Sequence, residues 1–313
     1  MAAQPPVVPA AAGEFGSSYL DHSREGKGQG GFYLLGLLVI LMAWLIAGSI
    51  VTGLLATALT GSVEAVGASD WQRLIIDLLP FSLLAIGVLL AVRLVLGRSA
   101  RTVVTGRPRV SIRRILAGAG VYAGLLAVTS TVDALLHPGA YVLTWDPARF
   151  FPVAVVVLLL IPVQASAEEL LFRGYIVQWT SLATDRPGRR MAPIPRLCVL
   201  ASVSGLVFAL PHLANPEARG AELYAWLVWF ILGAGWAWVS VLDGRIELAI
   251  GAHIANNVFA VLIVGYSASV IPTAGVWTTS VLDFPLMIAS TAAVAVAFAL
   301  ITCRRLRPRS GTS

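Results

Sequence analysis

Long runs of apolar residues without charge constrain this chain more than any other feature of its sequence. Residues 31–63 contain no charged side chain, and the whole chain is 58% hydrophobic and only 12% charged. A typical soluble domain carries about a quarter charged residues. About 20 apolar residues cross the roughly 30 Å hydrocarbon core of a bilayer as a helix, in which every backbone polar group is hydrogen-bonded. The sequence therefore predicts a helical membrane protein.

Eight windows of the sequence have the length and apolar character of a membrane span. We expect spans near residues 31–57, 74–96, 115–135, 150–180, 197–215, 223–242, 248–267 and 284–303. Pro162 lies inside the fourth window, where its missing N–H is expected to break the span into two pieces. The predicted fold class is all-α: a polytopic membrane protein of about eight transmembrane helices that enclose an intramembrane cavity.

The positions of the basic residues predict the orientation of the chain. With eight spans, both termini lie on one side of the membrane, which also receives the basic loops near residues 98–114 and 186–196. The other side receives Arg73, Arg149 and Arg219. Because cytoplasmic loops carry an excess of Lys and Arg, the sequence predicts that both termini are cytoplasmic. The basic residues behind the net charge of +6 are then explained by their role in orienting the chain in the membrane. No nucleic-acid partner is expected.

The ends of the chain differ in composition from its apolar centre. Residues 1–30 are rich in Pro, Ala, Gly and Ser and are expected to form a flexible cytoplasmic tail. Residues 31–305 form the predicted transmembrane helical domain, and residues 306–313 a basic cytoplasmic tail. A high content of Ala and Arg with little Lys favours an integral protein of a bacterial inner (plasma) membrane.

Ionisable residues inside spans are costly and usually mark a functional site. The strongest cluster is Glu168-Glu169-Leu-Leu-Phe-Arg173 on the fourth span. Glu169 and Arg173 are four residues apart and can pair on one helix face. Glu168 is rotated by about 100° and can point elsewhere, where a desolvated carboxylate can serve as a general base. The alternative is an ion pair that only fixes helix packing.

Two further polar groups lie on later spans. His212 follows Phe208-Ala-Leu-Pro near the end of the fifth span, and His253 and Asn257 share one face of the seventh. The predicted boundaries put His212 near the outer surface and His253 near the cytoplasmic one. The two histidines therefore converge only if the fifth helix starts below the membrane surface, is longer than predicted, or tilts strongly. A single membrane histidine is more often a packing residue, but three polar groups together favour a site.

The patterns Glu-Glu-x-x-x-Arg, Phe-x-x-x-His and His-x-x-x-Asn, each on its own apolar segment, resemble the CAAX prenyl protease and bacteriocin-processing family of intramembrane proteases. This family is also called CPBP or Abi. The resemblance covers about residues 150–265. It implies an active-site cavity in which glutamate-activated water hydrolyses a peptide bond of a membrane-associated protein or peptide. It also implies that Glu169 with Arg173 holds the helix and orients the site.

The resemblance implies roles for the other four residues. Glu168 is the expected base that activates water, assisted by His212. His253 and Asn257 are expected to polarise the scissile carbonyl and to stabilise the oxyanion, which agrees with the needs of amide hydrolysis. The expected partners are the lipid bilayer and the membrane-associated substrate.

A metal-dependent reaction is the alternative chemistry for the same residues. Two histidines and a glutamate are a legitimate zinc ligand set with water in the fourth position, and here they would be Glu168, His212 and His253. The sequence lacks the HExxH pattern that places two ligands and a base on one helix. The resemblance favours a reaction without metal, so no cofactor is expected, with a divalent metal such as zinc as the alternative.

Two other functions are compatible with the polar residues alone. The glutamates and histidines could form the proton relay of a proton-coupled membrane transporter, which calls for paired repeats with broken helices. No internal repeat is visible in the sequence. The third reading is an inactive scaffold that binds a membrane partner, which an intact set of polar residues disfavours.

Overall fold

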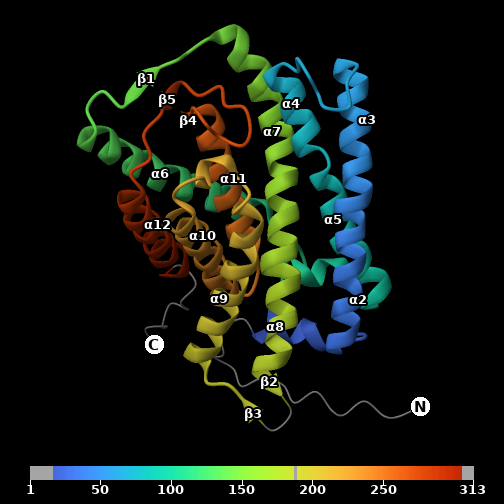
Figure 1. Ribbon diagram of the computed structural model, residues 1–313. Helices are drawn as coiled ribbons and strands as arrows, with labels where there is room; N and C mark the ends of the chain where they lie inside the picture. Colours follow the sequence, from blue (N-terminus) through green and yellow to red (C-terminus); the bar gives the residue numbers. More distant parts are fainter. Residues whose placement is uncertain (1–16, 187–188, 305–313) are drawn as a thin grey trace.

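A computed structural model describes residues 17–186 and 189–304 (Figure 1). Seven helices in this part of the chain are long and apolar enough to cross a membrane: Gly30–Thr60, Asp70–Val95, Ile112–Leu136, Pro147–Thr184, Pro193–His212, Glu222–Asp243 and Phe284–Cys303. Glu247–Leu262 is also apolar but has only 16 residues. Every predicted span corresponds to one of these helices. The predicted all-α membrane fold is confirmed.

Three of the long helices, among them the first two spans, are assembled from shorter segments. The first consists of α2 (Gly30–Leu41), the π-helical segment η2 (Met42–Ala47) and α3 (Gly48–Thr60). The second consists of α4 (Asp70–Leu78), α5 (Phe81–Leu90) and the π-helical η3 (Ala91–Val95). The remaining spans that are single helices are α6 (Ile112–Leu136), α9 (Pro193–His212), α10 (Glu222–Asp243), α11 (Glu247–Leu262) and α12 (Phe284–Arg304).

The fourth span is a continuous helix, so the break expected at Pro162 is wrong. Helix α7 (Pro147–Glu169) runs through Pro152 and Pro162 and continues through the π-helical η5 (Leu170–Ile176) into α8 (Val177–Thr184). Proline is tolerated in membrane helices because neighbouring groups and local helix adjustments satisfy the backbone carbonyl that it frees. The span therefore carries the Glu-Glu-x-x-x-Arg pattern across the centre of the bundle.

Short strands and single helical turns connect the spans. Strand β5 (Trp277–Thr279) pairs antiparallel with β1 (Tyr141–Leu143) and parallel with β4 (Val264–Tyr266), and β2 (Asp185–Arg186) pairs with β3 (Arg189–Arg190). The 3-10 turns are η1 (His22–Arg24), η4 (Ala100–Val103) and η6 (Pro216–Ala218).

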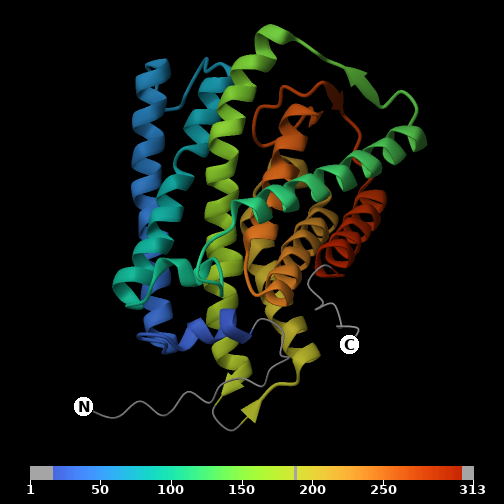
Figure 2. The same cartoon turned by 180° about the vertical axis from the view of Figure 1, so that it is seen from behind.

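Close packing of helices depends on glycines. Helix α6 crosses α11 at the back of the bundle (Figure 2), and a Cβ added at Gly118 would collide with the backbone oxygen of Leu248. A Cβ at Gly205 of α9 would lie 2.8 Å from the Phe230 oxygen of α10. Small residues at such crossings let membrane helices approach closely, since lipid supplies no hydrophobic drive between them.

Residues 17–24, before the first span, pack against the helical bundle. Helix α1 (Ser17–Asp21) and η1 pack against α8, and Tyr19 and Leu20 are buried. The Tyr19 hydroxyl donates to the backbone oxygens of Arg173 and Val103, and burial raises the pKa of this phenol well above its usual value. Residues 17–24 therefore differ from the flexible tail expected for residues 1–30. Residues 1–16 and 305–313 lie outside the described part of the chain.

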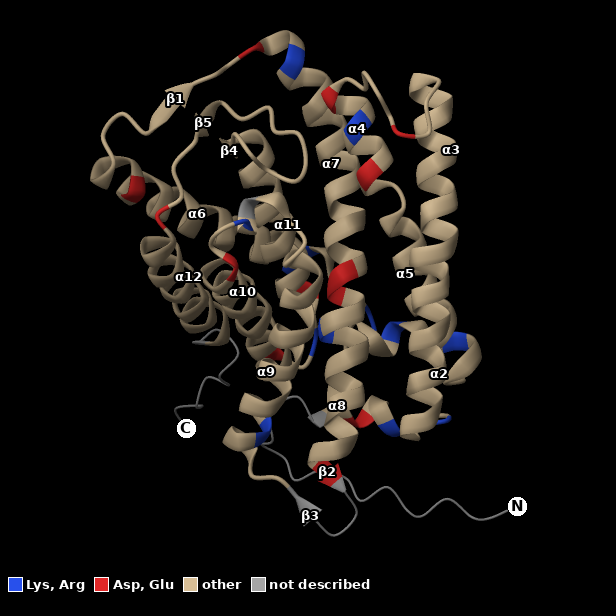
Figure 3. Cartoon of the chain, in the orientation of Figure 1, with Lys and Arg blue, Asp and Glu red and all other residues tan. Residues whose placement is uncertain are grey.

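The two ends of the bundle differ in charge. We call the end at which α2, α6, α9 and α11 begin the basic end, and the end at which α4, α7, α10 and α12 begin the opposite end. Blue ribbon segments, which mark Lys and Arg, are frequent toward the basic end in Figure 3. Arg98 and Arg101 lie after η3, and Arg245 lies just before α11 begins. The opposite end carries Arg73 and Arg149 alongside acidic side chains such as Asp70.

Candidate functional site

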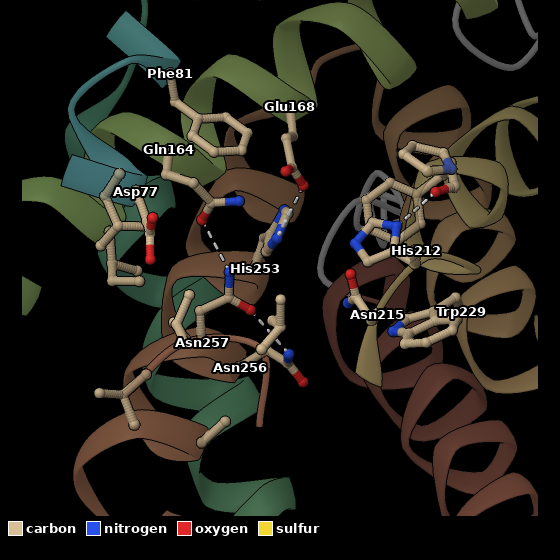
Figure 4. A pocket seen from close by; sticks show the side chains of 18 of the residues that line it. Asp77, Phe81, Gln164, Glu168, His212, Asn215, Trp229, His253, Asn256 and Asn257 are labelled. Atoms are coloured by element: carbon tan, nitrogen blue, oxygen red, sulfur yellow. Dashed lines mark hydrogen bonds and ion pairs between the residues drawn. The ribbon is translucent and has the colours of Figure 1, made fainter. Parts of the chain in front are cut away.

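A cavity of about 590 Å³ lies between α4, α5, α7, α9, α10 and α11. This volume is within the range of about 300–1,000 Å³ typical of ligand sites. Four of the six candidate residues line it: Glu168, His212, His253 and Asn257. Figure 4 shows Glu168 beside His253 on one wall, with Asn257 near them, and His212 on the facing wall. The structure thus brings side chains from three separate helices to one cavity.

Glu169 and Arg173 lie behind this wall and form the ion pair expected from their spacing. Glu169 Oε1 is 3.0 Å from Arg173 Nη1, and both side chains are fully buried. Arg173 Nη2 donates to the Gly233 oxygen at 3.4 Å, and its guanidinium lies 4.3 Å from the centre of the Phe208 ring. A guanidinium over an aromatic face is stabilised by the ring quadrupole. The pair therefore ties η5 to α9 and α10.

His253 lies between the two glutamates. Its Nδ1 is 2.9 Å from Glu169 Oε1, and its Nε2 is 3.6 Å from Glu168 Oε2. An ionised carboxylate only accepts hydrogen bonds, so Nδ1 carries a proton and donates to Glu169. The cluster of two glutamates also contains Arg173, so acidic and basic groups face one another inside the bundle.

Glu168 has unused hydrogen-bonding capacity. Its side chain is 9% exposed, and Oε2 is buried without a hydrogen-bond partner in the described part of the chain. A buried carboxylate oxygen is costly unless it is satisfied, and this one belongs to a residue that lines the cavity. The arrangement can therefore hold and polarise a water molecule or a substrate N–H.

His212 is the last residue of α9. Its Nδ1 is 2.8 Å from the Phe208 oxygen, and its ring centre is 5.2 Å from that of Trp229. A carbonyl oxygen only accepts, so Nδ1 is the donor and Nε2 of the neutral ring keeps a lone pair. Helix α9 begins at Pro193, and its first turns extend beyond the ends of α10 and α12 (Figure 1). This is why His212 reaches the same cavity as His253.

Gln164 was missed by the sequence reasoning. It lies one helical turn before Glu168, lines the cavity and accepts a hydrogen bond from Asn257 Nδ2 at 2.9 Å. Asn257 Oδ1 accepts from Asn256 Nδ2 at 3.1 Å. These bonds fix the orientation of the Asn257 amide and leave one of its two N–H groups unused. Its four-residue spacing from Glu168 places it on the same helix face, which could have identified it. An uncharged amide in an apolar span is, however, not unusual enough to indicate a functional residue.

The charged pair Arg73–Asp77 on α4 was also not predicted as part of the site. Both residues line the cavity, and Arg73 Nε donates to Asp77 Oδ2 at 2.9 Å. The Arg73 side chain is 47% exposed, so the pair contributes little to stability. The second span thus contributes an ion pair without net charge to the wall of the cavity.

Metal ligation does not follow from the geometry. Within residues 17–186 and 189–304, no group of three or more His, Cys, Asp or Glu side chains is placed to hold a metal ion. Glu168 and His253 are close together, but His212 lies across the cavity from them (Figure 4). We therefore derive no metal-dependent step, and independence from metal stays a prediction.

Comparisons with known proteins agree with the three patterns. Residues 147–259 match the family described as type II CAAX prenyl endopeptidase Rce1-like. The chain is also 34% identical over 185 residues to the uncharacterized protein YyaK of Bacillus subtilis (strain 168). That alignment covers 59% of this chain and 58% of YyaK, so the chain spans little more than half of this relative. Residues 147–259 of this integral membrane protein are thus similar to the Rce1-like family of type II CAAX prenyl endopeptidases.

Proposed function

We propose that the protein is an intramembrane endopeptidase that hydrolyses a peptide bond of a membrane-associated protein or peptide by glutamate-activated water. The observation that carries this proposal is that Glu168 Oε2 has no hydrogen-bond partner in the described chain and lies 3.6 Å from His253 Nε2, in a residue that lines the cavity with His212 and His253. Amide hydrolysis needs a deprotonated water, a stabilised oxyanion and a proton for the leaving amine. The cavity contains a carboxylate for the proton transfers and side-chain N–H donors for the oxyanion. The family match favours a protease and gives no support to a transporter.

Glu168 acts as the general base. It takes a proton from a water molecule that His212 Nε2 helps to orient from the facing wall. The oxygen of this water attacks the scissile carbonyl, and the proton then passes from Glu168 to the leaving amine. Each proton-transfer step of this kind contributes about 10²–10⁴-fold to the rate.

His253 and Asn257 stabilise the oxyanion. His253 donates through Nε2–H in its protonated form, while its Nδ1–H stays on Glu169. Asn257 donates through the N–H that Gln164 leaves unused. Donors that are oriented before the reaction need no reorganisation when the oxyanion forms. Glu169 and Arg173 act as positioning residues, because they hold His253 and do not line the cavity.

The proposed setting is a bacterial inner membrane with both termini in the cytoplasm. The support is the charge difference between the ends of the bundle, because basic residues are retained on the cytoplasmic side. The lipid bilayer and a protein or peptide substrate are the partners that this setting implies.

The test compares membranes from cells that produce the wild-type protein with membranes that contain Glu168→Gln or His212→Ala. New protein N-termini are quantified by mass spectrometry. We expect a set of cleavage products that both variants lack and that Glu64→Gln, a matched change in an exposed loop, retains. Identical products in wild type and Glu168→Gln, with all variants equally folded, would overturn the proposal. A parallel sample with a metal chelator tests whether cleavage needs a metal.

A further inference from the structure

Trp236 of α10 packs against two of the residues that form the proposed site. It is 2% exposed and lines the cavity. Its indole is stacked on the imidazole of His253, with ring centres 4.6 Å apart and an angle of 27° between the planes. The Arg173 guanidinium lies 5.2 Å from the centre of the Trp236 ring. Trp236 therefore contacts both the proposed oxyanion donor and the cation of the buried ion pair.

Hydrogen bonding alone does not fix the direction of His253 Nε2. The Nδ1–H of this ring donates to Glu169 at 2.9 Å, which restrains one atom of the imidazole and leaves the ring free to tilt about that atom. A flat ring against one face removes this freedom, since aromatic rings prefer defined stacked or edge-to-face geometries. Phe208 meets the same imidazole edge-on, with ring centres 5.9 Å apart and planes at 83°. Stacking on Trp236 therefore sets the plane of His253, and Glu169 sets its rotation within that plane.

Trp236 is itself held by three other helices. The Tyr122 ring of α6 meets the indole edge-on at 5.8 Å between centres and in turn packs against Phe298 of α12 at 5.4 Å. One turn before Trp236, Gly233 lies so close to α9 that an added Cβ would be 2.8 Å from the Cα of Gly205. Protein interiors are close-packed, and such a side chain cannot turn without moving its neighbours. The indole is therefore a fixed surface against which the imidazole rests.

The surface that Trp236 presents to His253 has no hydrogen-bonding atom. A polar side chain at this position would accept or donate hydrogen bonds and compete for the imidazole nitrogens. Against an aromatic face, both nitrogens are left to the partners in the plane of the ring: Nδ1 to Glu169, and Nε2 to the side where Glu168 Oε2 lies 3.6 Å away. Any large apolar side chain could fill the space of Trp236, but only a flat one sets the plane of the imidazole.

We propose that Trp236 is a positioning residue for the hydrolysis and acts through His253. Its indole face keeps the imidazole in the plane in which Nε2–H points at the oxyanion. The inference rests on the proposed function, because it concerns a donor of that reaction. Trp236 touches neither the attacking water nor the scissile bond, so its removal should slow the chemical step and leave substrate binding nearly unchanged.

Substitution of Trp236 tests this role by kinetics. Trp236→Met removes the flat face but fills much of its volume, since methionine is unbranched and flexible. We expect kcat to fall by up to about 10²-fold, the cost of misplacing a reacting group by about 1 Å. KM should change little, because the interaction is made only in the transition state. Trp236→Phe keeps a flat face and should retain most of kcat.

Trp238→Met is the matched control for this series. Trp238 lies on the same helix and is half-buried, but it does not line the cavity. Its replacement should leave kcat at the wild-type value. The substrate for all variants is a quenched fluorescent peptide that spans a cleavage site identified by the N-terminal mass spectrometry, and the unfolding temperature of each variant is measured beside its activity.

Nuclear magnetic resonance of the detergent-solubilised protein detects the contact without any need for activity. The chain has four histidines, so in protein with isotope-labelled histidine the ring signals of His253 are those that His253→Gln lacks. An indole face shields the protons that are stacked on it. The His253 signals should therefore move downfield in Trp236→Met, stay closer to the wild-type positions in Trp236→Phe, and be unchanged in Trp238→Met.

The outcomes separate positioning from packing. Wild-type kcat in folded Trp236→Met, an equal fall of kcat in Trp238→Met, or a fall of kcat with unmoved His253 signals would each overturn the proposal. If Trp236→Met does not fold, Trp236→Phe takes its place, and any fall in its kcat must be accompanied by displaced His253 signals. A wild-type protein that gives no products dependent on Glu168 would contradict the proposed function, whereas the shielding of His253 by Trp236 would still be observed.

Discussion

The two neighbouring glutamates of the fourth span have different surroundings. Glu169 is completely buried and contacts both Arg173 and His253 through Oε1. Glu168 lines the cavity and faces only His253 among the ion pairs of the described chain. Removing one partner of a buried ion pair leaves an uncompensated charge, whereas removing a charge that faces a cavity does not. The same chemical change should therefore have opposite effects on stability and activity at the two positions.

Glu169→Gln should destabilise the protein by about 3–5 kcal/mol, because the buried Arg173 guanidinium loses its counter-charge. Glu168→Gln should leave the unfolding temperature nearly unchanged and abolish cleavage. Thermal unfolding of the detergent-solubilised protein, measured beside cleavage, distinguishes the two. Equal loss of stability in both variants would show that the two carboxylates are not divided between structure and chemistry.

Gln164 should act on the reaction through Asn257. Asn257→Ala is expected to lower kcat by about 10²–10³-fold, the cost of one oxyanion donor. Gln164→Leu removes only the acceptor that orients this donor, and a hydrogen bond worth about 1 kcal/mol corresponds to less than about a tenfold fall in kcat, with KM nearly unchanged. In the Asn257→Ala background, Gln164→Leu should have no further effect. Additive effects of the two changes would argue against this coupling.

The candidate site was only partly predictable from single residues. The i,i+4 spacing was sufficient to predict the Glu169–Arg173 pair, because this pair forms within one helix. The position of His253 between the glutamates depends on a contact between residues 84 positions apart in the chain. Spacing alone does not encode such a contact. The role of Gln164 was hidden for the same reason, since its partner Asn257 lies on another helix.

At the scale of helices, the crossing of α6 and α11 depends on the absence of a side chain at Gly118. Gly118→Ala should destabilise the protein by about 1–3 kcal/mol, the usual cost of overpacking, because the new Cβ would meet the Leu248 backbone, which cannot turn away. Gly120→Ala is a matched control on the same helix, where a Cβ meets no atom within 4 Å in the described chain. Thermal unfolding of the two variants in one detergent is the measurement. Equal unfolding temperatures would contradict close packing at this crossing.

The end of α6 is joined to the start of α12 by a titratable contact. His137 Nδ1 is 3.1 Å from Asp133 Oδ1, and Nε2 is 3.3 Å from Asp283 Oδ2. Desolvation lowers the pKa of His137, but hydrogen bonding and charge interaction with Asp133, together with Asp283, outweigh it, so the pKa is raised above its ordinary value. A raised pKa in the folded state means that protonated His137 stabilises the fold at low pH. This contribution is lost as the pH rises through the raised value.

The unfolding temperature should therefore fall as the pH increases from slightly acidic to slightly alkaline values. His137→Gln should make this dependence shallower, and Asp283→Asn should do so in part, because Asp133 remains. The effect is expected to weaken in high salt, since the His137 side chain is 27% exposed. A pH dependence that is identical in wild type and His137→Gln would show that the contact does not contribute.

The hydropathy of the sequence predicts the positions of the membrane helices well. It does not predict whether a helix is interrupted, or which short strands connect the helices. The predicted span 284–303 agrees with the observed helix within a residue, because lipid requires an unbroken apolar helix. The break expected at Pro162 is wrong, because a rule that holds for helices in water was applied inside a membrane bundle. The three-residue strands β1, β4 and β5 are too short to give a detectable alternation in the sequence.

For the whole molecule, topology depends on the short helix α11. At about 1.5 Å per residue, its 16 residues reach about 24 Å, less than the roughly 30 Å of a bilayer core. Yet α11 runs beside α7 from the basic end toward the opposite end (Figure 1). The strands after it, β4 and β5, form one sheet with β1, in which β5 pairs with β1 beyond the end of α6. Surrounded by longer helices, α11 need not meet the full thickness of lipid. We therefore expect α11 to act as a span, which would make the number of spans even.

An even number of spans places both ends of the chain on one side, which a pair of protease-sensitive tags can test. A tag fused after Ser313 should resist protease added to intact cells, whereas a tag inserted at the exposed Gly139, between α6 and α7, should be cut. If α11 did not cross the membrane, the C-terminal tag would be cut together with the Gly139 tag. Protection at Gly139 with cutting after Ser313 would reverse the orientation. The two tags thus separate the number of spans from their direction.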